Sequence, residues 1–260
     1  MLAREREEPV AGALVGRSYP WAVETLLEEL AAAPDEAGLF LDFDGVLAPI
    51  VARPEDAVAP PETRAELERL AARYRLVAVV SGRPGDDVRR RVGLDGIVYV
   101  GTHGLELDPR AEEWRERVHA FGADAPWPTE QVEDKGLSVA FHYRDRDDED
   151  GARAELETLA SRAREQGFAT RFGRKVMEVL PPIDANKGTA VRRLLDESGL
   201  RRVLVAGDDT TDLDAFRAVE ELDCHVRVAV ASSEAPSLLR ERAEIVVDST
   251  GEFLELLRRL

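Results

Sequence analysis

Leu39-Phe40-Leu41-Asp42-Phe43-Asp44-Gly45-Val46-Leu47 is an apolar segment that carries two carboxylates and a glycine at its centre. Its apolar first half predicts a buried strand of a parallel sheet, and ligands bind at the carboxyl ends of such strands. Phe43 separates the two aspartates, so an extended chain would direct both to one face. Two carboxylates this close repel each other unless a cation neutralises them. The pair therefore predicts a metal site, and the turn at Gly45 predicts backbone N–H groups facing an anion. The alternative is an aspartate that only caps a turn.

A second strand pattern also ends in polar residues. The apolar run 76–80 leads into Ser81-Gly82-Arg83, which combines a hydroxyl, a flexible residue and a guanidinium. Ser81 can donate to a phosphoryl oxygen, and Gly82 allows the backbone to approach closely. This arrangement suits a phosphate, although a serine N-cap followed by a solvated arginine has the same pattern.

Two further segments complete the series. Asn186-Lys187-Gly188 opens an amphipathic stretch, so Lys187 falls at a helix start, where the helix dipole disfavours a cation. A lysine in that position predicts an anionic partner. The apolar run 203–206 is followed by Gly207-Asp208-Asp209-Thr210-Thr211-Asp212. Three acids at a strand end predict a site for a hard cation such as Mg²⁺.

Taken in order, D-x-D-G-x-L, S-G-R, the lone lysine and G-D-D-x-x-D resemble the haloacid dehalogenase superfamily of phosphatases. The resemblance implies that Asp42 is a nucleophile that forms an aspartyl phosphate and that Asp44 is a general acid and then a base. It also implies that Ser81 and Lys187 hold the phosphoryl oxygens. Val46 departs from the pattern, because the family commonly has Thr or Ser there.

The same resemblance implies a Mg²⁺ site. Its expected ligands are Asp42, the backbone carbonyl of Asp44, and Asp208, with Asp209 or Asp212 in support.

The spacing of the motifs predicts two domains. About a hundred residues separate Arg83 from Lys187, far more than one βα unit needs. We expect a doubly wound, mostly parallel α/β core formed by residues 1–107 and 184–260, with a smaller α/β cap inserted at 108–183. Within the insertion, the periodicity predicts strands over 136–143, 168–172 and 176–180 and a helix over 152–166.

The insertion resembles trehalose-6-phosphate phosphatases in the segments 132–138, 141–144 and 173–182, as do the core segments 101–106 and 207–216. The resemblance implies that Glu133, Lys135 and Glu178 bind sugar hydroxyls. Carboxylates accept from paired hydroxyls while an ammonium donates to them. Further candidates for substrate binding are Gly82, Arg83, His103 and Arg144. Of these, Arg144 could also be a solvated charge, and His103 could serve only its turn.

Composition excludes several other classes. The chain has 260 residues and a net charge of −17, which argues against nucleic-acid binding. No apolar stretch approaches the roughly 20 residues needed to span a bilayer, and the charged start does not fit a secretory signal. A single cysteine, Cys224, fits a reducing compartment, so we expect a cytoplasmic protein. The expected partner is a small molecule, and a monomer is favoured. Only three lysines occur, at positions 135, 175 and 187.

The two resemblances together imply a Mg²⁺-dependent phosphatase of trehalose 6-phosphate. Two alternatives remain open: a phosphatase of another sugar phosphate, such as sucrose or glucosylglycerol phosphate, or a catalytically idle module that binds a sugar phosphate. The idle module is disfavoured because it needs neither a nucleophile nor an acid.

Overall fold

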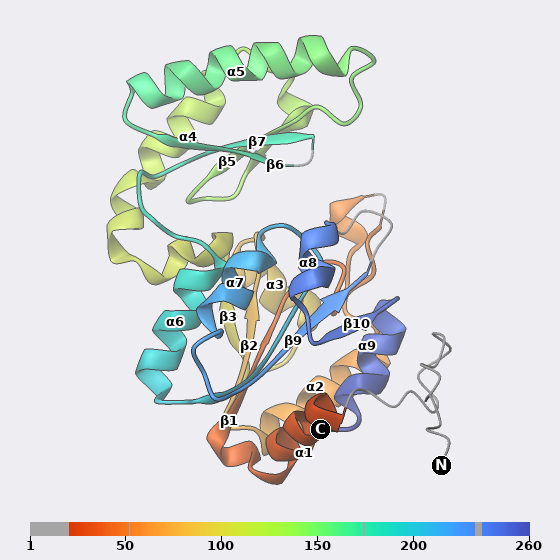
Figure 1. Cartoon of the computed structure of the whole chain (residues 1–260). Helices are drawn as coiled ribbons and strands as arrows, with labels where there is room; N and C mark the ends of the chain where they lie inside the picture. The colour runs from red at the N-terminus through yellow and green to blue at the C-terminus, as the bar shows by residue number, and fades with distance from the viewer. Residues whose placement is uncertain (1–20, 52, 174, 232–235) are drawn as a thin grey trace, which may run out of the picture.

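Two β-sheets of different kinds form the framework of the computed structural model, which describes residues 21–51, 53–173, 175–231 and 236–260. One sheet has six strands and the other four (Figure 1). The charged start of the chain, on which the prediction of no secretory signal rests, lies outside the described residues.

The six-stranded sheet is parallel throughout and has the order β10-β9-β8-β1-β2-β3. Its strands are β1 (Ala37–Leu41), β2 (Leu76–Val80), β3 (Val98–Val100), β8 (Arg202–Gly207), β9 (Cys224–Val230) and β10 (Ile245–Val247). Because β1 lies between β2 and β8, the carboxyl ends of three central strands meet at one edge of the sheet. The sequence motifs that follow these strands are thereby brought together.

Helices cover both faces of this sheet. Leu39 of β1 belongs to a core shared with α1 (Trp21–Ala32), α2 (Pro61–Arg73), α3 (Gly85–Val92) and α9 (Thr250–Leu257). Phe40, the next residue, faces the other way, into a core shared with α6 (Lys187–Ser198), α7 (Asp212–Ala218) and α8 (Ser237–Arg242). The period of two along β1 therefore builds a doubly wound α/β core, as the sequence predicts.

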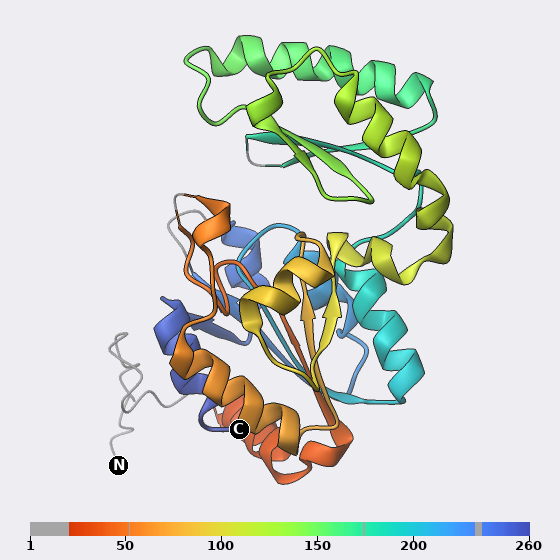
Figure 2. The ribbon, with the colours of Figure 1, turned by 180° about the vertical axis from the view of Figure 1, so that it is seen from behind.

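The four-stranded sheet is antiparallel and belongs to a second unit. Its order is β4-β5-β7-β6, with β4 (Val132–Asp134), β5 (Val139–His142), β6 (Ala169–Gly173) and β7 (Val176–Leu180). One face packs on α4 (Arg115–Ala123) and α5 (Glu149–Glu165) through a separate core that includes Phe141, Leu156 and Met177. The opposite face is turned toward the six-stranded sheet (Figure 2). A parallel core with an inserted α/β unit is therefore confirmed.

The predicted elements of the insertion differ from the observed ones in detail. The expected strand 136–143 begins only at Val139, because Lys135 to Ser138 form a turn in which the Lys135 N–H donates to the Ser138 carbonyl at 2.9 Å. The expected helix 152–166 begins earlier, at Glu149, because the Asp148 side chain accepts from the Gly151 N–H and caps it.

Short 3₁₀ segments complete the chain: η1 (Pro34–Glu36), η2 (Pro54–Asp56), η3 (Thr102–Leu107), η4 (Pro109–Trp114) and η5 (Thr129–Gln131). Across the described segments, no helix combines the length and the apolar character needed to cross a membrane.

Candidate active site

A cleft of about 370 Å³ lies between the carboxyl edge of the parallel sheet and the second sheet, a size typical of small-molecule sites. Every predicted site residue except Asp212 lines it. The lining residues are Asp42, Asp44, Ile50, Val51, Pro54, Ser81, Gly82, Arg83, His103, Glu133, Lys135, Arg144, Arg171, Gly173, Val176, Glu178, Lys187, Asp208, Asp209 and Thr211.

Lys187 is the central cation of the core wall. It is the first residue of α6, whose start is fixed by a capping box between Asn186 and Thr189. Its Nζ lies 2.8 Å from Asp42 Oδ2 and donates to Asp212 Oδ1 at 2.7 Å. Burial opposes the charge, but the two carboxylates outweigh it and raise the pKa of Lys187 above its ordinary value. The predicted anionic partner is therefore present in the protein itself.

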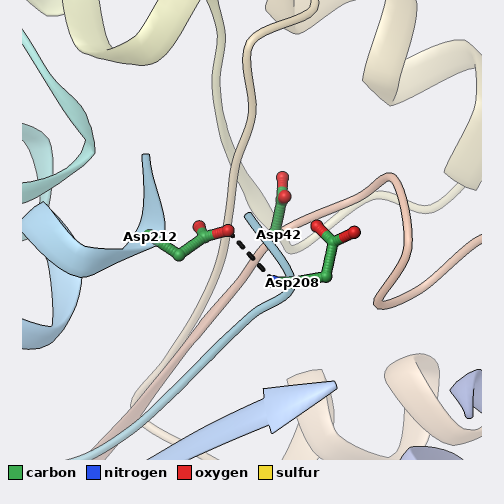
Figure 3. Close-up of side chains that lie close together, drawn as sticks. All are labelled: Asp42, Asp208 and Asp212. Atoms are coloured by element: carbon green, nitrogen blue, oxygen red, sulfur yellow. Dashed lines mark hydrogen bonds between the residues drawn. The ribbon is translucent and has the colours of Figure 1, made fainter. Parts of the chain in front are cut away.

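Three buried carboxylates meet beside this lysine. Asp42, Asp208 and Asp212 each offer an oxygen within 4.8 Å of the others (Figure 3). Burial raises the pKa of Asp42 to about 7, although Lys187 opposes the rise, and burial together with Asp42 raises that of Asp208 to about 9. Carboxylates that resist ionisation in this way call for a further positive charge.

The donor set fits a hard divalent cation. In the described part of the chain, no donor hydrogen-bonds to the Asp208 carboxylate, which leaves its oxygens available. A Cβ on Gly45 would lie 2.1 Å from Asp208 Oδ2, so only glycine leaves room for this carboxylate. Asp212 also accepts from the backbone N–H groups of Asp208 and Asp209, both at 3.1 Å. These oxygens are the ligand type that Mg²⁺ prefers.

The two supporting aspartates differ in position. Asp212 belongs to the buried group of three, whereas the Asp209 side chain lines the cleft and accepts from the Thr210 N–H at 2.6 Å.

Asp44 is held by Arg83. The guanidinium donates from Nε to Asp44 Oδ2 at 2.7 Å and from Nη2 to Oδ1 at 2.8 Å, a bidentate pair. Both oxygens of the predicted acid and base are thus occupied. The turn that follows differs from the expectation, because the Gly45 N–H donates to the Ala48 carbonyl at 2.8 Å and is not free for an anion.

The segments after β2 and β3 pack closely together. Ser81 is almost fully buried, and its Oγ accepts from the Arg83 N–H at 3.2 Å. A Cβ on Gly82 would lie 2.6 Å from His103 Nε2, so glycine admits the imidazole. His103 has φ 54°, and burial lowers its pKa to about 3. Its Nδ1 has no partner among the described residues. His103 is therefore a neutral, partly buried wall of the cleft.

The opposite wall follows from strand register. Glu133 on β4 and Glu178 on β7 both pair with Ala140 on β5, so they share one face of the second sheet. Lys135 lies between them, with its Nζ donating to Glu178 Oε1 at 2.7 Å and 3.9 Å from Glu133 Oε2. Burial favours the neutral acid, but Lys135 outweighs it and holds the pKa of Glu178 below its ordinary value. The wall is therefore charged at neutral pH.

Arg144 and Lys175 differ in their relation to the cleft. Arg144 lines the cleft, and its side chain is exposed. Lys175 pairs with Glu149 at 2.5 Å and is not among the lining residues.

Sequence reasoning missed Arg171, which lines the cleft in register with Glu178. It also missed several lining residues: Ile50, Val51, Pro54, Gly173, Val176 and Thr211. The alternation along 169–173 could have placed Arg171 on one face, but not beside Glu178.

A family model described as trehalose-phosphatase matches residues 40–243, which include the whole cleft. The chain belongs to the trehalose-phosphatase family. It is 37% identical over 207 residues to the trehalose-phosphate phosphatase of Mycobacterium tuberculosis (strain H37Rv), an alignment that covers 71% of this chain and 51% of that protein. The chain therefore spans about half the length of the mycobacterial relatives that it matches.

Solved structures agree with the family. A trehalose-6-phosphate phosphatase related protein is similar with a TM-score of 0.65 and 25% identity, covering 85% of this chain and 95% of that one. A haloacid dehalogenase-like hydrolase from Bacteroides thetaiotaomicron shares the fold, with a TM-score of 0.58 at 15% identity over 86% of this chain and 99% of that one. The family thus lies within the haloacid dehalogenase-like fold, as the motif order predicts.

Proposed function

We propose that this protein hydrolyses trehalose 6-phosphate to trehalose and phosphate through an aspartyl phosphate on Asp42. The observation that carries the proposal is the two-walled cleft. One wall has a buried carboxylate nucleophile beside an ammonium, and the other has a charged group suited to sugar hydroxyls. Membership of the trehalose-phosphatase family supports the same substrate.

Asp42 attacks the phosphorus atom, and the bond from phosphorus to the sugar oxygen breaks. Asp44 gives that oxygen a proton and then removes one from the water that attacks the aspartyl phosphate, which releases phosphate and restores Asp42. Lys187 and Ser81 hold the phosphoryl oxygens. Arg83 donates one hydrogen bond to each oxygen of Asp44, which fixes the orientation of the carboxylate and leaves lone pairs that can hold the proton.

Mg²⁺ is the proposed cofactor. Asp42, the Asp44 carbonyl and Asp208 would hold it, with Asp212 and Asp209 in support. When bound, it supplies positive charge opposite the phosphoryl oxygens.

Residues 108–183 are proposed as a cap that selects the sugar. Glu133, Lys135 and Glu178 accept from and donate to its hydroxyls, and Arg144 and His103 lie at the same cleft. Gly82 and Arg83 contact the phosphate end. A monomer in the cytoplasm remains our expectation for the whole protein.

The test is phosphate release from a panel containing trehalose 6-phosphate, sucrose 6-phosphate, glucosylglycerol phosphate and glucose 6-phosphate. We expect trehalose 6-phosphate to have the highest kcat/KM. A higher value for another sugar phosphate would reassign the substrate, and no turnover of any would leave a binding module.

A further inference from the structure

Two exposed apolar side chains lie at the mouth of a cleft whose other lining side chains are mostly charged. Ile50 is 53% exposed and Val51 is 37% exposed, and both line the cleft. We call this pair the apolar tip. Single exposed apolar residues are ordinary on protein surfaces. Two adjacent ones at the rim of a charged cleft need a more specific account.

Neither side chain belongs to a hydrophobic core formed by the described residues. The segment that carries them is anchored before the tip by Leu47 and Ala48, which are fully buried, and after it by Ala57 and Ala59. Arg91 holds the later part from outside the segment, donating to the carbonyls of Glu55 at 2.9 Å and Ala57 at 2.8 Å. The chain is therefore anchored on both sides of the apolar tip, at Leu47 and Ala48 before it and at residues 55–59 after it.

The second sheet also contributes an apolar side chain to the lining of the cleft. Val176 and Gly173 pair in register at the β6–β7 end of the second sheet, and both line the cleft. The segment with η2 rises from the core toward the second sheet (Figure 1). The lining of the cleft thus includes apolar residues from both units, Ile50 and Val51 from the core and Val176 from the second sheet, besides the charges around Asp42 and Lys187.

We propose that the apolar tip is a specificity-determining element that contacts the C–H face of the second glucose ring, the ring without phosphate. This rests on the proposed function. A sugar ring carries hydroxyls at its edge and C–H groups on its faces, so a site that reads the whole disaccharide needs apolar contact as well as hydrogen bonds. The phosphate is held at the carboxylate end, which leaves the far ring for the apolar end.

The test compares the double variant I50S/V51S with V58S. Val58 is the matched control, because it is an exposed valine of the same segment, 56% exposed, that does not line the cleft. Two quantities are measured for each protein: kcat and KM for trehalose 6-phosphate, and the Ki of glucose 6-phosphate as a competitor. Glucose 6-phosphate has the phosphorylated ring but lacks the second one.

Removing a methylene-sized contact from a pocket lowers kcat/KM about ten-fold or more. We expect the double variant to show at least that loss, through KM, with kcat and the Ki of glucose 6-phosphate unchanged. V58S should match wild type, and I50L should keep most of the affinity.

Three results would overturn the inference: no change in either kcat or KM, an equal rise in KM and in the Ki of glucose 6-phosphate, or a decrease in kcat with KM unchanged. The last result would assign the tip to docking of the second unit. A wild-type protein that does not turn over trehalose 6-phosphate would refute the proposed function instead, so the two failures are distinguishable.

Discussion

Replacement of Lys187 by methionine tests the electrostatic organisation of the core wall. The change keeps the apolar stem of the side chain but removes the ammonium that contacts Asp42 at 2.8 Å and Asp212 at 2.7 Å. Lys187, Asp42 and Asp212 are all almost fully buried. Removing one partner of a buried ion pair costs about 3–5 kcal/mol, because the remaining charge is left without compensation. We expect K187M to lose about that much free energy of unfolding at pH 8 without metal.

The loss should also depend on pH. Burial raises the pKa of Asp42 to about 7 against the opposing effect of Lys187, so it rises further when the ammonium is removed. A carboxyl group whose folded pKa is raised stabilises the fold less as pH increases through that range. In K187M this decline extends to higher pH than in wild type. The difference between the two proteins should therefore widen from pH 6 to pH 9.

The assay is urea unfolding followed by far-UV circular dichroism in EDTA, with midpoints compared at several pH values. K175M is the matched control, because Lys175 forms an exposed ion pair with Glu149, and such pairs contribute about 0–1 kcal/mol. Equal small losses in both variants, or a difference that narrows as pH rises, would refute the reasoning.

Three further predictions concern the chemistry. Asp42→Asn should keep the fold but lower kcat by several orders of magnitude, and rapid turnover by a clean D42N preparation would contradict this. Asp44→Asn should impair hydrolysis of an aryl phosphate less than that of a sugar phosphate, because only the poor leaving group needs a proton. Binding of Mg²⁺ should release protons from Asp42 and Asp208, so the affinity for Mg²⁺ should increase from pH 6 to pH 9. Calorimetry in buffers of different ionisation enthalpy measures this proton release, and an affinity that does not depend on pH would argue against these ligands. Lys135→Ala and Glu178→Ala should each lower kcat/KM for trehalose 6-phosphate about ten- to two-hundred-fold, because each loses a charged hydrogen bond worth roughly 1.5–3 kcal/mol. The kcat/KM for a small aryl phosphate should change little, and equal losses for both substrates would assign the two residues to folding or phosphate binding.

The core could be predicted closely from sequence because its strands are continuous apolar runs followed at once by polar residues. The predicted run 76–80 coincides with β2, and 203–206 lies within β8. Strand β4 could not be found in this way, because Val132-Glu133-Asp134 has no apolar pattern and is a strand only through its pairing with β5. Strands β9 and β10 were not predicted, although 224–230 alternates recognisably.

The site shows the same division. Motif order placed Asp42, Lys187 and Asp208 at one edge, and the structure brings them together there. The sequence alone could not decide whether Asp209 or Asp212 supports the predicted metal site, because the two residues are only three positions apart. In the structure Asp212 is the first residue of α7 and belongs to the buried group of carboxylates. Arg171 was missed because it reaches the cleft through the pairing of β6 with β7, which places it opposite Glu178. The local sequence around Arg171 does not contain this register.

The distribution of lysines has a practical consequence for labelling. Lys135 and Lys187 are held in ion pairs inside the cleft, whereas Lys175 pairs with Glu149 outside it, between β6 and β7, with about a third of its side chain exposed. Amine-reactive dyes attack accessible, uncharged amines, so apart from any terminal amine they should attach selectively at Lys175. The protein can thus carry a fluorophore at the tip of its second unit without mutagenesis. Paired with an acceptor on the core, such a label would follow the distance between the two units during turnover.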